Sequence, residues 1–112
     1  EIFFERSTKD FGYDIDVGAI SNNSKISSVA IQLKLLTSKK QIFKNLKKGF
    51  EQLQKVPDSF EKVLDMKLPL NYKEFVDSNR EKALLYELME LTKKYGKSKV
   101  KMKFSDGTIK KY

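Results

Sequence analysis

The sequence contains no cysteine and no histidine among its 112 residues. Without cysteine, disulfide bonds, thiolate zinc sites and thiol nucleophiles are excluded. Without histidine, the commonest general base is missing, and with it Ser-His-Asp triads, paired-histidine ribonucleases and histidine-based metal nucleases. Any catalysis must therefore use Asp, Glu, Lys, Arg, Tyr, Ser, Thr or Gln side chains.

Long apolar runs are also missing, because no stretch approaches the roughly 20 residues that a membrane-spanning helix needs. No signal-peptide pattern is present. Hydrophobic residues make up 39% of the chain and charged residues 34%, so the chain can form one hydrophobic core. The chain begins with Glu1 rather than Met. We therefore expect a single domain, residues 1–112, excised from a longer protein.

The formal net charge of +8 is spread unevenly along the chain. The first 20 residues carry five acids and two bases, so the remaining 92 residues carry a net charge of +11. A basic surface favours a polyanion through counterion release, whatever the sequence of that polyanion. The charge therefore predicts a nucleic acid, DNA or RNA, as the partner.

Two segments near the N-terminus, residues 11–20 and 26–36, alternate between apolar and polar side chains. A period of two is typical of β-strands, and the turn cluster at residues 21–24 favours an antiparallel hairpin. One face of the second strand is aliphatic: Val29, Ile31, Leu33 and Leu35. We expect this aliphatic face to pack against the helices.

The middle of the chain has helical spacing. A first helix is expected to begin at Thr37 or Ser38 and to end at Pro57, and Asp58 can begin a shorter helix that stops at Pro69. A short helical turn is expected at residues 72–76. The spacing of Ser78-Asn79-Arg80-Glu81 then predicts a capping box for a last helix that ends at Gly96.

The C-terminal segment has the alternation of a second hairpin. The Asp-Gly pair at residues 106–107 predicts a two-residue type I′ turn, which would set Lys103 opposite Lys110 and place lysines on one face with Tyr112 nearby. The whole order predicts an α+β domain: an N-terminal β-hairpin, three or four helices and a C-terminal β-hairpin. Its strands would pack against the helices as one mixed or antiparallel sheet.

Four polar residues of the first hairpin share the face opposite to the aliphatic one: Asp14, Asp16, Gln32 and Lys34. Side chains on one face of neighbouring strands can converge. Two carboxylates and an amide oxygen suit Mg²⁺ or Mn²⁺, and a lysine beside the ion can position or deprotonate an attacking water. The alternative interpretation is a solvated outer face with ordinary Asp–Lys cross-strand pairs.

These residues resemble the PD-(D/E)XK nuclease superfamily, in which a strand bearing an Asp precedes a strand reading apolar-apolar-(Asp/Glu)-x-Lys and then a helix. Residues 12–17 resemble the first strand, and the helix from about Ser38 resembles the third element. Residues 29–34 resemble the second strand, with Gln32 at the position of the acid, as in the branches of the superfamily that carry Gln-x-Lys.

The resemblance implies a metal-dependent nuclease whose ion is Mg²⁺ or Mn²⁺. Asp14 and Asp16 would hold the ion, with either as the main ligand, and Gln32 and Lys34 would complete the catalytic set. The family often adds an acid from an N-terminal helix, and Glu5 is the candidate. The family also has a strand soon after the helix, where the residue pattern of this chain predicts a further helix.

A small basic catalytic domain cut from a longer chain is also similar to the C-terminal toxin modules of bacterial contact-dependent inhibition systems and colicins. This similarity implies transfer RNA as a substrate and the bacterial cytoplasm as the site of action. It also implies an acidic immunity protein as a partner, which the charge of +8 would suit.

Lysines of the first helix and of the C-terminal hairpin are predicted to bind phosphates: Lys39, Lys40, Lys44, Lys47, Lys48, Lys101, Lys103 and Lys110. Two other functions stay open. One is a metal-free ribonuclease toxin whose site is formed by the lysines of the C-terminal hairpin and Tyr112. The other is a non-catalytic basic module that binds nucleic acid and in which the acids are incidental.

Overall fold

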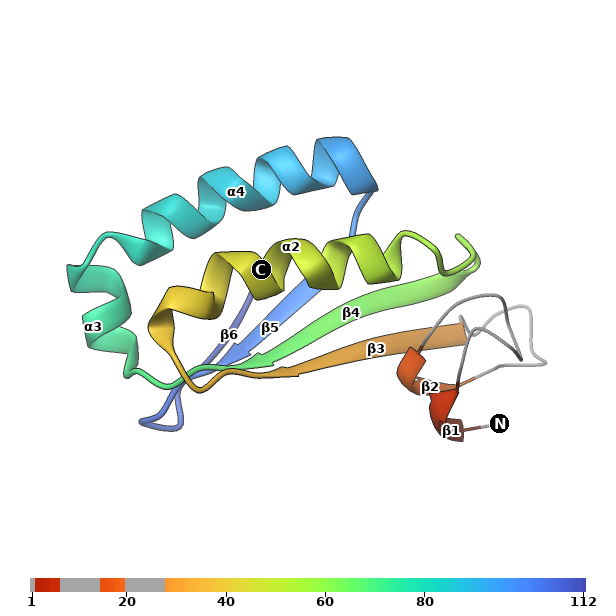
Figure 1. Ribbon diagram of the computed structural model, residues 1–112, viewed down its shortest axis with the longest axis horizontal. Coiled ribbons are helices and arrows are strands. Elements are labelled where there is room, and N and C mark those ends of the chain that lie inside the picture. The colour runs from red at the N-terminus through yellow and green to blue at the C-terminus, as the bar shows by residue number, and fades with distance from the viewer. Residues whose placement is uncertain (1, 7–14, 20–27) are drawn as a thin grey trace.

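The computed structural model describes residues 2–6, 15–19 and 28–112, and the side chains of 28–112. The domain is α+β, as predicted: a six-stranded mixed sheet lies beneath a layer of helices (Figure 1). None of the helices in this described part of the chain has the length and apolar character that a membrane span needs.

The strands follow one another across the sheet in sequence order. Strands β1, β2 and β3 pair antiparallel, β4 is parallel to β3, β5 is parallel to β4, and β6 is antiparallel to β5. The predicted N-terminal and C-terminal hairpins are both confirmed as antiparallel pairs. The strand bounds are β1 Ile2–Arg6, β2 Ile15–Ala19, β3 Ser28–Leu35, β4 Phe60–Lys67, β5 Lys99–Lys103 and β6 Ile109–Lys111.

Helices make the crossovers that the parallel strand pairs require. The 3₁₀ turn η1 and helix α2 connect β3 to β4, and helices α3 and α4 connect β4 to β5. Ser38 caps the first of these, since its side chain accepts a hydrogen bond from the backbone N–H of Lys40 at 3.3 Å. The bounds are η1 Lys39–Gln41, α2 Ile42–Leu53, α3 Tyr72–Asp77 and α4 Arg80–Tyr95.

The segment that begins at Asp58 was predicted to be helical and is instead the strand β4. The apolar spacing of Phe60, Val63 and Leu64 fits a helix as well as a strand. Here β4 pairs on both sides, with β3 and with β5, and Leu64 and Met66 are buried beneath the helices. Tertiary pairing therefore decides the structure of a short segment whose local pattern is ambiguous.

The core lies between the sheet and the helices, and buried residues of α3 and α4 join those of α2 in it. Helical spacing from the sequence predicts apolar positions at Ile42, Phe43, Leu46, Phe50 and Leu53, and all of these are buried except Phe43, which is partly buried. Gly49 faces the sheet so closely that a Cβ atom added there would lie 2.5 Å from Cδ1 of Leu64. The absence of a side chain at Gly49 therefore allows α2 to cross β4 at close range.

Helix α4 ends at Gly96 as predicted, but the predicted capping box does not form. Asn79 occupies the cap position with φ of 60° and makes no side-chain cap hydrogen bond. The hydroxyl of Ser78 instead donates to the carbonyl oxygen of Glu74 at 2.7 Å. Helix α3 ends immediately before Ser78, so the preceding turn uses the hydroxyl that the capping box would need.

The C-terminal hairpin has a longer turn than predicted. Lys103 pairs with Ile109 and Met102 with Lys110, one residue away from the expected register. The N–H of Phe104 donates to the carbonyl oxygen of Thr108 at 2.8 Å and closes this wider turn. A shift of one residue moves side chains to the opposite face. Lys110 therefore lies on the same side of the sheet as the buried Met102.

Candidate functional site

The two faces of β3 are the reverse of those predicted. Gln32 is 3% exposed beneath the helices, whereas Leu33 is 49% and Leu35 is 74% exposed on the other side. The physical reason is Leu36, which is buried in the core and sets the alternation of the strand that precedes it. Ala30, Gln32 and Lys34 share the face of Leu36, and the aliphatic face points away from the helices.

The reversal places Gln32 in a sheltered position rather than on a solvated outer face. Its register neighbour Leu64 is fully buried. Within the described residues, Oε1 of Gln32 has no hydrogen-bond partner. A buried amide oxygen without a partner costs about 1–3 kcal/mol. The fold retains this polar group at a position where an apolar side chain would pack without that cost.

Lys34 follows Gln32 on the same face of β3, near the carboxyl end of the strand. It is partly exposed and lies in register with the buried Met66 of β4. The predicted pairing of Gln32 and Lys34 on one face is therefore observed, with the amide buried and the ammonium-bearing residue closer to solvent.

The backbone register brings the predicted acids into the same part of the sheet. Val17 of β2 pairs with Phe4 of β1 and with Ile31 of β3. The next row of the sheet therefore holds the backbone positions of three polar residues: Glu5, Asp16 and Gln32. The side chains of Glu5 and Asp16 lie outside the described part of the chain, and Asp14 lies outside it altogether.

Glu5 was expected on an N-terminal helix, but it is part of strand β1. The reason is its pairing, because residues 2–6 form a continuous antiparallel ladder with β2. Among the side chains of residues 28–112, no group of three acids could hold a metal ion. The assignment of Asp14, Asp16 and Glu5 as metal ligands therefore stays a prediction.

A second buried amide oxygen was not identified from the sequence. Oε1 of Gln52 on α2 is buried and, among the described residues, has no hydrogen-bond partner. Gln52 lies one turn after Gly49, which packs on Leu64, and Leu64 is the register neighbour of Gln32. The available signal was the position of Gln52 beside Leu53, at the border of the apolar stripe of α2.

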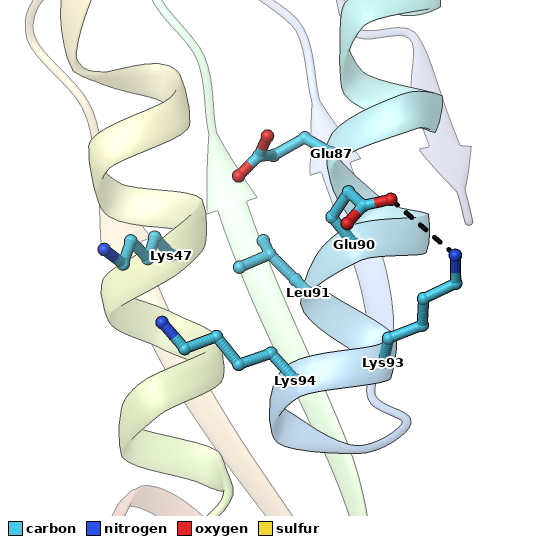
Figure 2. Close-up of a pocket in the computed structure, with 6 residues that line it drawn as sticks. All are labelled: Lys47, Glu87, Glu90, Leu91, Lys93 and Lys94. Atoms are coloured by element: carbon cyan, nitrogen blue, oxygen red, sulfur yellow. Dashed lines mark ion pairs between the residues drawn. The ribbon is translucent and has the colours of Figure 1, made fainter.

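The lysines of η1 and α2 that were predicted to bind phosphates are exposed. Lys47 borders a groove of about 360 Å³ between α2 and α4, into which Lys94 of α4 also points (Figure 2). Glu87 and Glu90 line the same groove, and Glu90 forms an ion pair with Lys93 at 3.7 Å. Acidic side chains therefore offset part of the positive charge beside α2.

The structure does not bring together the residues of the metal-free site. Tyr112 pairs with the buried Val100, so it lies on the helix-covered face with Lys110. Lys101 and Lys103 alternate with buried residues and lie on the other face. Burial and the carboxylate of Glu81 raise the pKa of Tyr112, which therefore stays protonated near neutral pH.

No family model, no curated protein and no solved structure matches this chain. The functional argument therefore rests on the residues and on the arrangement of the sheet.

Proposed function

We propose that this chain is a metal-dependent nuclease that hydrolyses the phosphodiester bonds of DNA or RNA. The observation that carries the proposal is the buried Oε1 of Gln32, which lacks a hydrogen-bond partner in the described residues and lies in a row with two acidic positions. A buried oxygen of this kind calls for a hydrogen-bond donor or a cation. Acidic positions beside it favour the cation.

The order of the elements also supports the proposal. Three antiparallel strands lead into α2, and β4 then returns parallel to β3. A strand soon after the helix is what the resemblance to PD-(D/E)XK nucleases implies, and β4 occupies the segment where the residue pattern had predicted a helix. The position of β4 therefore supports the proposal.

The donor set fits a hard divalent cation, because it consists of carboxylate oxygens and an amide oxygen. Asp14, Asp16 and Glu5 would hold Mg²⁺ or Mn²⁺ together with Oε1 of Gln32. When bound, the ion would supply Lewis-acid stabilisation of the charge that develops on the phosphate. Lys34 would hold the attacking water and add positive charge at the phosphate.

We further propose, more specifically, that this nuclease is a toxin domain that cleaves transfer RNA and is neutralised by an acidic immunity protein. Its support is the small size of the domain and the charge of +8. A non-catalytic module that binds nucleic acid is the second candidate, and it is favoured by the exposed lysines of η1 and α2.

The test is incubation of the chain with DNA, total RNA and purified transfer RNA, each with Mg²⁺ and with EDTA. Cleavage that requires Mg²⁺ supports the proposal, and cleavage that persists in EDTA excludes the metal-dependent mechanism. Binding without any cleavage would leave the non-catalytic module as the function.

A further inference from the structure

The face of the sheet opposite to α2 and α4, here called the open face, gathers lysines from three neighbouring strands. Val100 and Met102 of β5 are buried beneath the helices, so Lys101 and Lys103 lie on the open face. In the register of the sheet, Lys103 is paired with Lys67 of β4, and Lys101 is paired with Lys111 of β6. These four residues are called the lysine quartet.

The quartet places like charges directly opposite one another. Paired residues on neighbouring strands have Cβ atoms about 4.5–5.5 Å apart, and like charges at that distance destabilise a sheet. Among the described residues, no member of the quartet forms an ion pair, although Lys99 on the same face pairs with Glu61. The fold therefore retains a repulsive arrangement that an external anion would relieve.

One acid lies close to the quartet. Asp65 occupies the register position beside Lys101, but it forms no ion pair with any lysine of the described residues. On the part of the open face formed by β4, β5 and β6 there are five lysines and two acids, Asp65 and Glu61. The net charge of this part of the face is therefore positive. A hollow of about 600 Å³ is lined by two members of the quartet, Lys101 and Lys111, together with Lys97, Lys99, Glu61, Val63, Val100 and Tyr112.

We propose that the lysine quartet binds the phosphate backbone of nucleic acid, on the opposite face of the sheet from Gln32 and Lys34. Lysine acts as a point charge that suits phosphate contacts without base recognition. A protein partner is less suited, because protein interfaces are enriched in arginine and aromatic residues and depleted in lysine. The exposed Leu33 and Leu35 of β3 border the quartet on one side, since they are in register with Asp65 and Lys67 of β4.

The proposal rests on the proposed function in one respect, the identity of the polyanion as nucleic acid, and it does not require cleavage. The quartet would hold the substrate away from the reacting phosphate and increase its local concentration. Lys67 and Lys103 are the last residues of β4 and β5, and they lie one register row beyond Lys34. The quartet therefore extends to the carboxyl ends of these strands, at the same end of the sheet as Lys34.

The test measures binding of a labelled single-stranded DNA oligonucleotide by fluorescence anisotropy in EDTA, at several salt concentrations. The variant replaces Lys67, Lys101, Lys103 and Lys111 with Gln. The control replaces four exposed lysines of the helical layer with Gln and loses the same charge: Lys73, Lys82, Lys93 and Lys94. The quartet variant should bind more than about tenfold more weakly at about 0.1 M salt, with a salt slope reduced by about 3.

The control should lose less than about threefold, because it alters net charge without altering the open face. Equal losses in the two variants, or full binding by the quartet variant, would overturn the proposal. Asp65→Asn removes a repulsive carboxylate and should tighten binding; unchanged or weaker binding would count against the quartet as the contact. Cleavage in Mg²⁺ is measured separately. A quartet variant that binds and cleaves nucleic acid as the wild type does would contradict this inference but not the proposed nuclease function.

Discussion

Tyr112 and Tyr72 both donate hydrogen bonds to the same carboxylate oxygen, Oε2 of Glu81, at 2.9 and 2.8 Å. The three residues come from the end of the chain, from α3 and from α4. The ammonium group of Lys110 also lies 4.8 Å from the centre of the Tyr72 ring. These contacts connect the C-terminal strand to helices α3 and α4.

The first prediction concerns the pH dependence of these contacts. Burial and Glu81 raise the pKa of Tyr112, so its contribution to stability is complete below pH 10, the ordinary tyrosine value, and is lost at higher pH. Tyr112→Phe should lower the free energy of unfolding by about 1 kcal/mol at pH 8. The difference between the two proteins should shrink above about pH 10.

Urea unfolding at pH 8 and above pH 10 measures this difference. Tyr86→Phe is the matched control, because Tyr86 is 64% exposed on α4 and should leave stability unchanged. A Tyr112→Phe difference that grows with pH would contradict the assigned direction of the pKa shift.

The second prediction tests the close contact between α2 and β4. Gly49→Ala should destabilise the domain by about 1–2 kcal/mol, because the added methyl group overlaps Leu64 and outweighs the gain in helix propensity. The same substitution in a Leu64→Ala background should be neutral or stabilising, since the space is then vacant. Equal effects of Gly49→Ala in both backgrounds, measured by urea unfolding, would show that the contact is not the cause.

Much of this fold could be predicted from residue patterns. The stripe from Ile42 to Leu53 and the stop at Gly96 are strong local signals, and both are confirmed. The segment of β4 could not be assigned, because its strand structure depends on ladders with β3 and β5 that lie far away in sequence. The register of the last hairpin was wrong because the Asp-Gly pair allows a longer turn.

The shared face of Gln32 and Lys34 could be predicted from the sequence, but its burial could not. The pairing of Gln32 with Lys34 on one face follows from the period of a strand. The burial of that face depends on Leu36 and on the path of the chain into α2. The four aliphatic residues of β3 had instead predicted that the opposite face would be buried. Gln52 was missed because its position beside Leu53, at the border of an apolar stripe, is only a weak signal of burial.

The third prediction follows from the buried amide. Gln32→Met replaces an amide that lacks a hydrogen-bond partner in the described residues with an apolar side chain of similar size. In EDTA, this variant should be more stable than the wild type by about 1 kcal/mol, because the unpaired oxygen is removed. If Gln32 contributes to a cation site, the variant should also lose any stabilisation that Mg²⁺ gives to the wild type.

Thermal unfolding with Mg²⁺ and with EDTA measures both effects. Gln54→Met is the control, because Gln54 is exposed at the end of α2. A variant that is less stable in EDTA would mean that Gln32 has a partner in the folded chain. An unchanged response to Mg²⁺ would remove Gln32 from the cation site.

The fourth prediction separates catalysis from binding at Lys34. Lys34→Ala should reduce the Mg²⁺-dependent cleavage rate by at least about 100-fold, because positive charge at the reacting phosphate stabilises the transition state. Affinity for nucleic acid in EDTA should fall less than about threefold, since one phosphate contact contributes little. Lys62→Ala is the matched control: Lys62 is on the same face of the neighbouring strand and pairs with Asp58 at 3.4 Å. Parallel losses of cleavage and affinity in Lys34→Ala would instead assign Lys34 to phosphate binding alone, since a residue that acts on the transition state changes the rate more than the affinity.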